Sequence, residues 1–362
     1  MNFFAQDNFS NPKIQYEEIG SDWRPFYDIL KNYFDNPIIK SVCKVGGTAA
    51  HSENFKIILN AGNSEEEVLV RKHKTLQTDQ IKFYSGLAYR LNKFGAKVIV
   101  PLKTIAGEWM VVVEDEYYQV YKFISAEHFY PSMKSFCSVA KAIAQLHLAF
   151  NALDSSDFDR IQTLSHHGDL YFNVIETYSK KDFINLQNII DKKSEKTEID
   201  KEVLNRIPCF LDAVKEVKNH EQDIENLSKQ IIHSDTHPHN FLIKNDDVEA
   251  ILDLGGMRVS QQARDVAHAI YRLGRQFFVH KDVEQTKENA SKLKDMFIES
   301  YNEVKNLLDK EKEMMPYLLK DEFIRKNLFV LNGVYKQNNR VWASNLSKFL
   351  IAMDEIKFFW PS

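Results

Sequence analysis

The sequence predicts an α+β protein with two lobes, a small one built on an antiparallel sheet and a larger one that is mainly helical. At 362 residues the chain is longer than a single hydrophobic core usually supports. Short apolar or alternating runs bounded by turn residues crowd residues 38–124, which is the pattern of strands. From residue 132 onward, apolar residues recur at helical spacing. We expect a helical extension over 1–35, a first lobe over 36–122 and a second lobe over 123–362.

Composition narrows the class of protein. Hydrophobic residues make up 44% and charged residues 27%, as in ordinary soluble globular proteins. A formal charge of −4 gives no basic field that would attract nucleic acid or an anionic membrane. Cys43, Cys137 and Cys209 are far apart and form no C-x-x-C pair, which favours a reducing compartment. Without a signal-peptide pattern or an apolar run of membrane-spanning length, we expect a cytoplasmic protein, and the sequence leaves its oligomeric state open.

The first lobe begins with a helix and a strand pair around a glycine turn. Apolar and aromatic residues over 22–34 share one helical stripe, as in a packing helix. Strands follow over 38–45 and 55–59, with Gly46 and Gly47 between them. Backbone amides can approach phosphate where side chains are absent, so a strand–glycine–strand unit suits a hairpin that covers a nucleotide. Taken alone, the two glycines predict only a turn.

A third strand, over 68–72, ends in two cations, Arg71 and Lys72. A strand beneath a nucleotide should carry one positive side chain that offsets the charge of the phosphates. Successive strand residues point to opposite faces, so only one of the two can have this role. The alternation of apolar residues along the strand does not decide between them.

The next stretches predict a helix, a strand group and a second helix. Apolar residues over 78–94 lie at helical spacing, with Gly95 as the stop. Residues 97–104, 109–114 and 117–124 alternate or run apolar and complete the sheet. A strong helix over 132–150 carries a buried or half-buried His147, and a helical, charge-mixed region extends to residue 230.

The most informative stretch runs from residue 231 to 256 and contains His233, Asp235, Asn240 and Asp253. Two short apolar runs flank a turn rich in Asn and Asp, which predicts a β-hairpin. If Lys244 faces Glu249 across the turn, Asn240 faces Asp253. Opposed side chains in an antiparallel pair have Cβ atoms roughly 4.5–5.5 Å apart. One Mg²⁺, which prefers oxygen ligands, would then fit between the Asn carbonyl and the Asp carboxylate.

Asp235 lies on the loop just before this hairpin. A carboxylate beside a metal-bound phosphate can accept a hydroxyl proton and direct that oxygen in line at phosphorus. The three groups therefore predict phosphoryl transfer, with Asp235 as base and Asn240 and Asp253 as magnesium ligands.

The pattern H-x-D-x-x-x-x-N, followed by a strand pair and D-L-G, resembles the catalytic signature of the aminoglycoside phosphotransferase and choline/homoserine kinase group. This resemblance implies a protein-kinase-like fold and transfer of the γ-phosphoryl of ATP, or of GTP, to a hydroxyl of a small molecule. It implies that His233 supports the catalytic loop and that Arg71, in V-L-V-R, is the better candidate for the phosphates. It further implies a hinge over 118–124 that holds adenine, with Tyr121 and Phe123, and an Asp265 that buttresses the loop while capping a helix.

The chain also departs from that group. The full G-x-G-x-x-G pattern of protein kinases is missing. A helix Glu usually pairs with the strand cation, yet Tyr84 and Ser85 occupy its expected place here. The segment 167–173 imitates the signature, but its Asn follows Asp169 by four residues and no strand pair ending in an acid follows. It is more consistent with the wall of a substrate pocket or with plain structure.

Two other classes of function stay open. Four potential metal ligands lie within seven residues, as in a zinc hydrolase: His233, Asp235, His237 and His239. That interpretation leaves Asn240 and Asp253 without a role. A non-catalytic nucleotide-binding regulator of the same fold is the other alternative. The acceptor is open as well, because an amino alcohol, a homoserine-like amino acid, a sugar or an aminoglycoside fits the same machinery.

Overall fold

The computed structural model describes residues 13–20, 22–46, 52–61, 64–167, 175, 177–339 and 346–361. The chain forms two compact units. We call Asn11–Tyr130 together with His239–Gly255 the sheet unit, and Pro131–Pro238 together with Gly256–Ser362 the helical unit. The predicted α+β class is confirmed. The domain boundaries predicted at residues 35 and 122 remain predictions.

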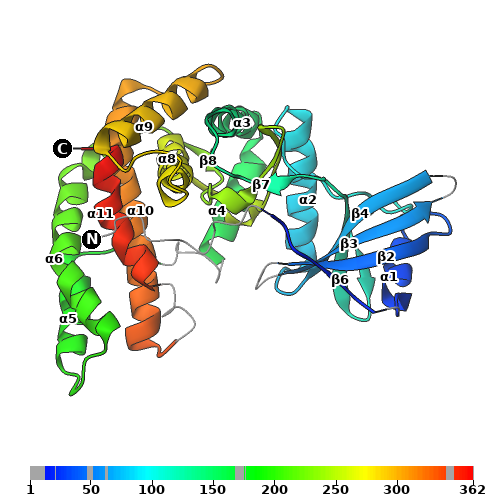
Figure 1. Cartoon of the computed structure of the whole chain (residues 1–362), viewed down its shortest axis with the longest axis horizontal. Helices are drawn as coiled ribbons and strands as arrows, with labels where there is room; N and C mark the ends of the chain where they lie inside the picture. The colour runs from blue at the N-terminus through cyan, green and yellow to red at the C-terminus, as the bar shows by residue number, and fades with distance from the viewer. Residues whose placement is uncertain are drawn as a thin grey trace. The chain divides into compact units, whose positions relative to one another are not determined.

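The sheet unit is built on a six-stranded antiparallel sheet with the strand order β1-β2-β3-β4-β6-β5 (Figure 1). Its strands are β1 (Tyr16–Glu18), β2 (Ile38–Val45), β3 (Ser52–Ala61), β4 (Ser64–His73), β5 (Val111–Val113) and β6 (Glu116–Lys122). The strand predicted over 97–104 is wrong. Only isolated bridges at Val98 and Pro101 occur there, and a proline has no N–H with which to continue a ladder.

Two helices accompany this sheet, α1 (Arg24–Leu30) and α2 (Thr78–Lys93). Phe26, Ile29 and Leu30 of α1 pack in one buried cluster with Val70 and other valines, isoleucines and leucines of β2, β3, β4 and β6. Each fully buried side chain of this kind contributes about 1.5–3 kcal/mol. At the end of α2, Gly95 has φ +88°, a conformation that costs glycine no Cβ clash, so the predicted helix stop is confirmed.

A second, three-stranded sheet in the same unit has the order β10-β9-β7. Its strands are β7 (Glu127–His128), β9 (Phe241–Lys244) and β10 (Asp247–Ile251), and short 3₁₀ turns flank the hairpin at Pro238–Asn240 and Leu254–Gly256. Lys97 Nζ donates to the Val248 carbonyl at 2.6 Å, and the Ile251 N–H donates to the Lys97 carbonyl at the same distance. The hairpin is therefore fixed to the segment that follows α2.

The helical unit contains a two-stranded sheet, β8 (Lys229–Ile232) with β11 (Arg258–Gln261), and helices around it. Every residue of α8 except Arg272 is buried, including Asp265 and His268. Helices α6, α10 and α11 pack together in this unit (Figure 1). The helices are α3 (Met133–Asn151), α4 (Ser155–His167), α5 (Lys180–Asp191), α6 (Glu198–Asn219), α7 (Glu221–Glu225), α8 (Gln262–Val279), α9 (Lys287–Asn302), α10 (Asp309–Lys336) and α11 (Leu346–Phe359).

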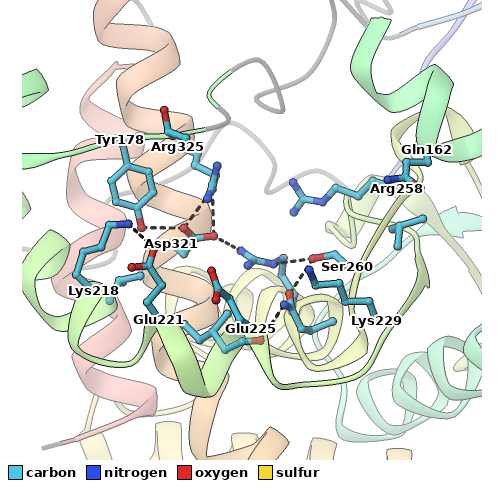
Figure 2. A pocket seen from close by; sticks show the side chains of 16 residues that line it. Gln162, Tyr178, Lys218, Glu221, Glu225, Lys229, Arg258, Ser260, Asp321 and Arg325 are labelled. Atoms are coloured by element: carbon cyan, nitrogen blue, oxygen red, sulfur yellow. Dashed lines mark hydrogen bonds and ion pairs between the residues drawn. The ribbon is translucent and has the colours of Figure 1, made fainter.

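The helical unit also encloses a pocket of about 620 Å³ (Figure 2). The lining residues labelled in Figure 2 are mainly polar. Tyr178 reaches it from the segment before α5, and its hydroxyl donates to Asp321 of α10 at 2.7 Å. Phe183, in α5, is fully buried and stacks on Phe210 with ring centroids 4.7 Å apart.

Within the described part of the chain, no single helix is long and apolar enough to cross a membrane. Helix α3 and the segment Ser155–Leu164, bent by 112° against each other, pass that test only as a pair and only by length and composition. The three cysteines are free thiols of intermediate exposure.

Candidate active site

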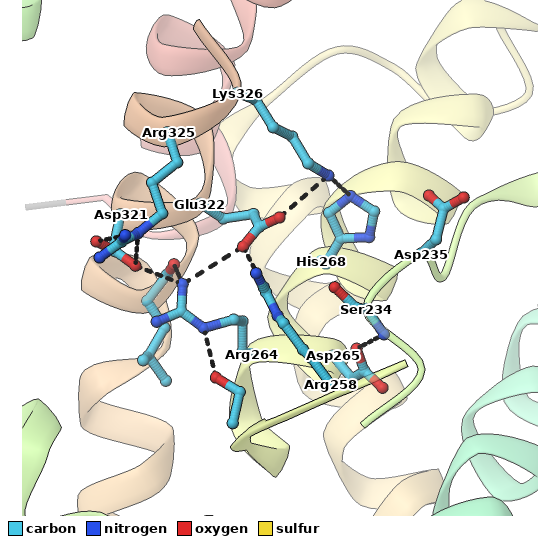
Figure 3. Close-up of polar contacts among 12 residues, drawn as sticks. Ser234, Asp235, Arg258, Arg264, Asp265, His268, Asp321, Glu322, Arg325 and Lys326 are labelled. Atoms are coloured by element: carbon cyan, nitrogen blue, oxygen red, sulfur yellow. Dashed lines mark hydrogen bonds and ion pairs between the residues drawn. The ribbon is translucent and has the colours of Figure 1, made fainter. Parts of the chain in front are cut away.

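The loop that carries Asp235 is held from behind by one buried carboxylate. It follows β8, and its His233 N–H donates to Asp265 Oδ2 at 2.6 Å. Figure 3 shows the neighbouring contact between Ser234 and Asp265. The Ser234 N–H donates to Asp265 Oδ1 at 2.8 Å, and Ser234 has φ +70°, so the chain turns sharply here. Two charge-assisted hydrogen bonds thus fix the backbone directly before Asp235.

Asp265 is itself braced from two other helices. His147 Nε2 of α3 lies 3.2 Å from Asp265 Oδ2, and His147 Nδ1 lies 2.8 Å from the Tyr301 hydroxyl of α9. Burial lowers the pKa of His147, so the neutral ring donates to the carboxylate through Nε2–H and accepts from Tyr301 at Nδ1. The sequence predicted that Asp265 caps a helix, which is wrong: α8 begins at Gln262, so Asp265 lies in its first turn.

Asp235 is partly accessible, with 27% of its side chain exposed. Its Oδ2 lies 3.3 Å from His237 Nε2, and its N–H donates to the buried His233 at Nδ1, 3.3 Å away. Burial opposes ionisation of Asp235, but His237, Lys326 and His268 outweigh it and lower the pKa of the carboxyl well below its ordinary value. Asp235 is therefore a carboxylate at neutral pH.

A second hydrogen-bond chain continues from this loop into α8 and α10. Lys326 Nζ lies 3.2 Å from His268 Nε2, and His268 Nδ1 lies 3.1 Å from Thr236 Oγ1. The ammonium can only donate, so His268 accepts at Nε2 and donates to Thr236 at Nδ1. The Thr236 hydroxyl donates in turn to the Asp265 carbonyl at 3.1 Å. His268 and Lys326 were not predicted from the sequence, because no local signal marks a contact between residues 58 positions apart.

In the sheet unit, the β9–β10 hairpin carries Asn240 and Asp253 at its open end, but the predicted register is wrong. Lys244 pairs with Asp247, because Asn245 and Asp246 both adopt left-handed conformations and make a two-residue turn. A bulge between Val248 and Ala250 then shifts the register by one residue. Leu252, rather than Asp253, lies opposite Asn240, and its N–H donates to the Asn240 carbonyl at 2.9 Å.

Asn240 and Asp253 suit a hard cation. Asn240 is buried at the end of a 3₁₀ turn, and Asp253 follows directly after Leu252 with φ +57°. Asp253 Oδ1 accepts the Gly255 N–H at 3.3 Å, which leaves its other oxygen for a ligand. Amide and carboxylate oxygens are the donors that Mg²⁺ takes when phosphates and water fill its remaining positions.

The residues of the zinc alternative are used differently. Among the residues that the structure describes, no three His, Cys, Asp or Glu side chains form a group that could hold a metal ion. His233 and His237 both contact Asp235 or its backbone, as described above. His239 packs against His128 of β7, with ring centroids 4.9 Å apart.

Arg71 and Lys72 lie on opposite faces of β4. Lys72 shares the face of Val70, which packs on α1, and Lys72 Nζ forms an ion pair with Glu116 at 3.0 Å. Arg71 lies on the other face, where its Nε donates to Asn54 Oδ1 at 2.9 Å. Its guanidinium lies over the Tyr121 ring, 5.5 Å from the centroid. In the described residues Arg71 has no carboxylate partner, so its charge is uncompensated.

A neutral polar cluster replaces the helix Glu that the sequence lacks. Gln119 Nε2 donates to Ser85 Oγ of α2 at 2.7 Å. Gln119 Oε1 accepts from the Tyr121 hydroxyl at 2.8 Å and lies 2.8 Å from His73 Nε2. All four side chains are buried. Tyr121 therefore connects this cluster to the face of Arg71. The Arg71 side chain is held by its hydrogen bond to Asn54 and its contact with the Tyr121 ring instead of by an ion pair.

The glycine and hinge positions are partly described. The Gly46 N–H donates to the Gln15 carbonyl at 2.7 Å, and a Cβ at Gly46 would come within 3.2 Å of that oxygen. Gly47 lies outside the described residues, and so do Asp169 and the rest of the imitating segment except His167. Phe123 follows β6, and its N–H donates to the Glu67 carbonyl at 3.0 Å. The Phe123 N–H is therefore already hydrogen-bonded within the sheet unit.

Comparisons with known proteins agree with this geometry. The model of the phosphotransferase enzyme family, APH, matches residues 46–289. Comparison with curated protein sequences gives no match. The spectinomycin phosphotransferase in complex with ADP and spectinomycin superposes with a TM-score of 0.66 at 13% identity, covering 95% of this chain and 98% of that one.

Two further solved structures share the fold. An amicoumacin kinase in complex with AMP-PNP, Ca²⁺ and Ami has a TM-score of 0.63 at 11% identity, covering 94% of this chain and 96% of that one. An ethanolamine kinase of Plasmodium vivax has a TM-score of 0.56 at 15% identity, with coverages of 88% and 83%. The family model spans more than half of the 362 residues. The chain therefore belongs to the phosphotransferase enzyme family.

Proposed function

We propose that this enzyme is a small-molecule kinase in which Asp235 receives the acceptor hydroxyl. The observation that carries the proposal is the double hydrogen bond from the His233 and Ser234 backbone to Asp265, which fixes the loop directly before Asp235. Such rigid support is what a catalytic group needs, because misplacement by about 1 Å can cost roughly a hundredfold in rate. His233 belongs to the same support through its contact with the Asp235 N–H.

In the reaction, Asp235 orients more than it deprotonates. Its lowered pKa makes it a weak base but a permanent carboxylate. The acceptor O–H donates to this carboxylate, and its oxygen bonds to the γ-phosphorus as the bond to the β–γ bridging oxygen breaks and ADP leaves. A loose transition state leaves the proton on the hydroxyl until late in the reaction, when Asp235 takes it.

Asn240 and Asp253 are the proposed magnesium ligands. When bound, Mg²⁺ would neutralise charge on the β- and γ-phosphates. Arg71 is the proposed phosphate contact, because Lys72 is already paired with Glu116. Gly46 and Gly47 are proposed, from the sequence, to belong to the segment that covers the phosphates. Tyr121 and Phe123 belong to the proposed adenine hinge.

The acceptor and location complete the proposal. The neighbours are named as kinases of spectinomycin, amicoumacin and ethanolamine, so we propose a hydroxylated small molecule as acceptor. We place the enzyme in the cytoplasm, where the thiols of Cys43, Cys137 and Cys209 would stay reduced.

The test is a thermal shift with ATP and with GTP, each with and without Mg²⁺, followed by assay of ADP or GDP release on a panel of hydroxylated metabolites. A ligand at a hundred times its Kd stabilises the folded state by about 2.7 kcal/mol. A Mg²⁺-dependent shift with turnover of one acceptor class supports the kinase. A shift without turnover favours the non-catalytic regulator, and no nucleotide shift at any Mg²⁺ concentration overturns the proposal.

A further inference from the structure

The pocket of the helical unit has an unequal charge balance. Among the described residues, five cations line it, namely Lys218, Lys229, Arg258, Arg264 and Arg325. Three described carboxylates line it, those of Glu221, Glu225 and Asp321. The described part of the wall therefore carries two more positive than negative charges, in a chain whose formal net charge is −4. This excess is local and is placed around a cavity of about 620 Å³.

The pocket wall shares Asp321 and three arginines with a buried ion-pair cluster whose Glu322 and Lys326 are not among the lining residues. Asp321 accepts from Arg325 at 3.1 Å and from the Tyr178 hydroxyl (Figure 2). It also accepts from Arg264 at 2.7 Å (Figure 3). Glu322 pairs with Arg258 and lies 3.3 Å from Lys326 and 3.5 Å from Arg264 (Figure 3). Four cations thus surround two carboxylates. Burial would raise the pKa of both acids, yet the neighbouring cations lower it, first of all Arg264 for Asp321 and Arg258 for Glu322.

The accessible side adds one cation and one anion. Lys229 and Glu225 both line the pocket and are exposed, and neither has an ion-pair partner among the described residues. A ligand with a carboxylate and an ammonium group would find a complementary charge for each. Guanidinium forks bind carboxylate with two parallel hydrogen bonds, which a neutral alcohol cannot offer.

Asp235 is not among the lining residues, but the pocket wall is linked to its loop through the backbone. Arg258 pairs with Ile232 across β11 and β8, and Asp235 follows Ile232 by three residues. Three residues span at most roughly 11 Å. Lys326, which contacts Glu322 on the pocket side, also contacts His268 beside the loop.

From this arrangement we infer that the pocket binds the carboxylate of the acceptor, which is then a hydroxylated amino acid and not an amino alcohol or an aminoglycoside. The inference rests on the proposed kinase function and specifies its substrate class. A polycationic acceptor would meet the exposed Lys229 and the excess of cations over carboxylates among the described lining residues.

The test uses pairs of compounds that differ only in the carboxylate. These are L-serine with ethanolamine, L-threonine with 1-amino-2-propanol, and L-homoserine with 3-amino-1-propanol. Binding of each to the full chain is measured by calorimetry, and turnover separately by ADP release. The variant Lys229→Glu reverses an exposed charge in the pocket, and Lys287→Glu makes the same reversal at an exposed lysine on α9, outside it. Arg325→Lys keeps the charge but removes the fork.

We expect the acid of at least one pair to bind about tenfold or more tightly than its amine, and Lys229→Glu to abolish that difference. Arg325→Lys should weaken the acid alone, and Lys287→Glu should change neither. Equal binding within every pair, tighter binding of the amines, or acid binding that survives Lys229→Glu would overturn the inference. Acid binding that depends on Lys229, without ADP release for any compound, would instead count against the kinase function and leave the pocket's specificity standing.

Discussion

The carboxylate of Asp265 accepts the backbone N–H of His233 at 2.6 Å, although 32 positions separate the two residues. The second oxygen of the same carboxylate accepts the Ser234 N–H. The loop of Asp235 is thus positioned by α8, and through His147 and Tyr301 by α3 and α9. Under the proposed role of Asp235, stability and catalysis are coupled at this point, because the group that orders the loop is buried within the helical core.

Replacing Asp265 should therefore affect both properties. Asp265→Ala leaves the His233 and Ser234 amides and His147 without their acceptor, and should lower the free energy of unfolding by roughly 3–5 kcal/mol. Asp265→Asn retains one acceptor oxygen and should fold better, yet lose about ten- to a hundredfold in kcat as the loop shifts. Urea unfolding and steady-state kinetics measure the two effects. Asp295→Ala, at an exposed acid on α9, is the control. An unchanged kcat in Asp265→Asn would show that the hydrogen bonds between Asp265 and the loop are not needed for catalysis.

Asp235→Asn should remove turnover while sparing nucleotide binding. The amide keeps the size of the side chain but cannot take the hydroxyl proton, so kcat should fall about 10²–10⁴-fold. The thermal shift with ATP and Mg²⁺ should stay as in the wild type. Turnover that persists at the wild-type rate would exclude Asp235 as the group that receives the hydroxyl.

Asp253→Ala should weaken binding of ATP only when Mg²⁺ is present. Its carboxylate is the charged member of the proposed ligand pair, so the Mg²⁺ concentration needed for half of the nucleotide shift should rise about tenfold or more. Asp79→Ala, at an exposed acid on α2 of the same unit, should leave the midpoint unchanged. An identical Mg²⁺ midpoint in Asp253→Ala would exclude that residue as a ligand.

Local patterns predicted much of the fold. The strand over 38–45 was predicted at its observed bounds, and the helix over 78–94 and its glycine stop lie within one residue of α2. Candidate site residues could be named from the sequence where they lie close together, as from His233 to Asp253, and their roles remain proposals. The hairpin register could not be predicted, because the apolar pattern does not reveal a bulge at residue 249.

Support from distant residues could not be predicted in the same way. His147 reaches Tyr301 across 154 positions, and Lys326 reaches His268 from another helix. Nothing in the spacing of either residue signals its partner. The choice between Arg71 and Lys72 likewise depends on which face of β4 packs on α1, a tertiary fact that alternation along one strand leaves open.

Arg71 and Lys72 should respond differently to neutralisation. Arg71 has no carboxylate partner in the described residues, so Arg71→Gln should raise KM for ATP about tenfold through loss of a phosphate contact. Lys72→Gln removes an ion pair with the partly exposed Glu116 and should change KM by less than about twofold. Initial rates over a range of ATP concentrations, with acceptor saturating, measure both. The reverse order of effects would assign the phosphate contact to Lys72.

Acid should destabilise the protein through its buried histidines. Burial, with Arg71 nearby, lowers the pKa of His73 from 6.5 to about 4. The folded state therefore resists protonation that the unfolded chain accepts. The contribution of His73 to the free energy of unfolding is fully present above pH 6.5. It declines by up to about 3 kcal/mol as the pH falls to 4. His147 and His268, whose pKa values burial also lowers, act in the same direction.

The variant His73→Gln isolates one part of this effect. Glutamine can still hydrogen-bond to Gln119 but does not titrate, so the loss of stability between pH 6.5 and pH 4 should be smaller than in the wild type. Urea unfolding at pH 7.5, 6 and 5 measures the difference. An equal slope in both proteins would mean that His73 is as easily protonated in the folded state as in the unfolded chain, and that the cluster of Gln119, Ser85 and Tyr121 tolerates an imidazolium.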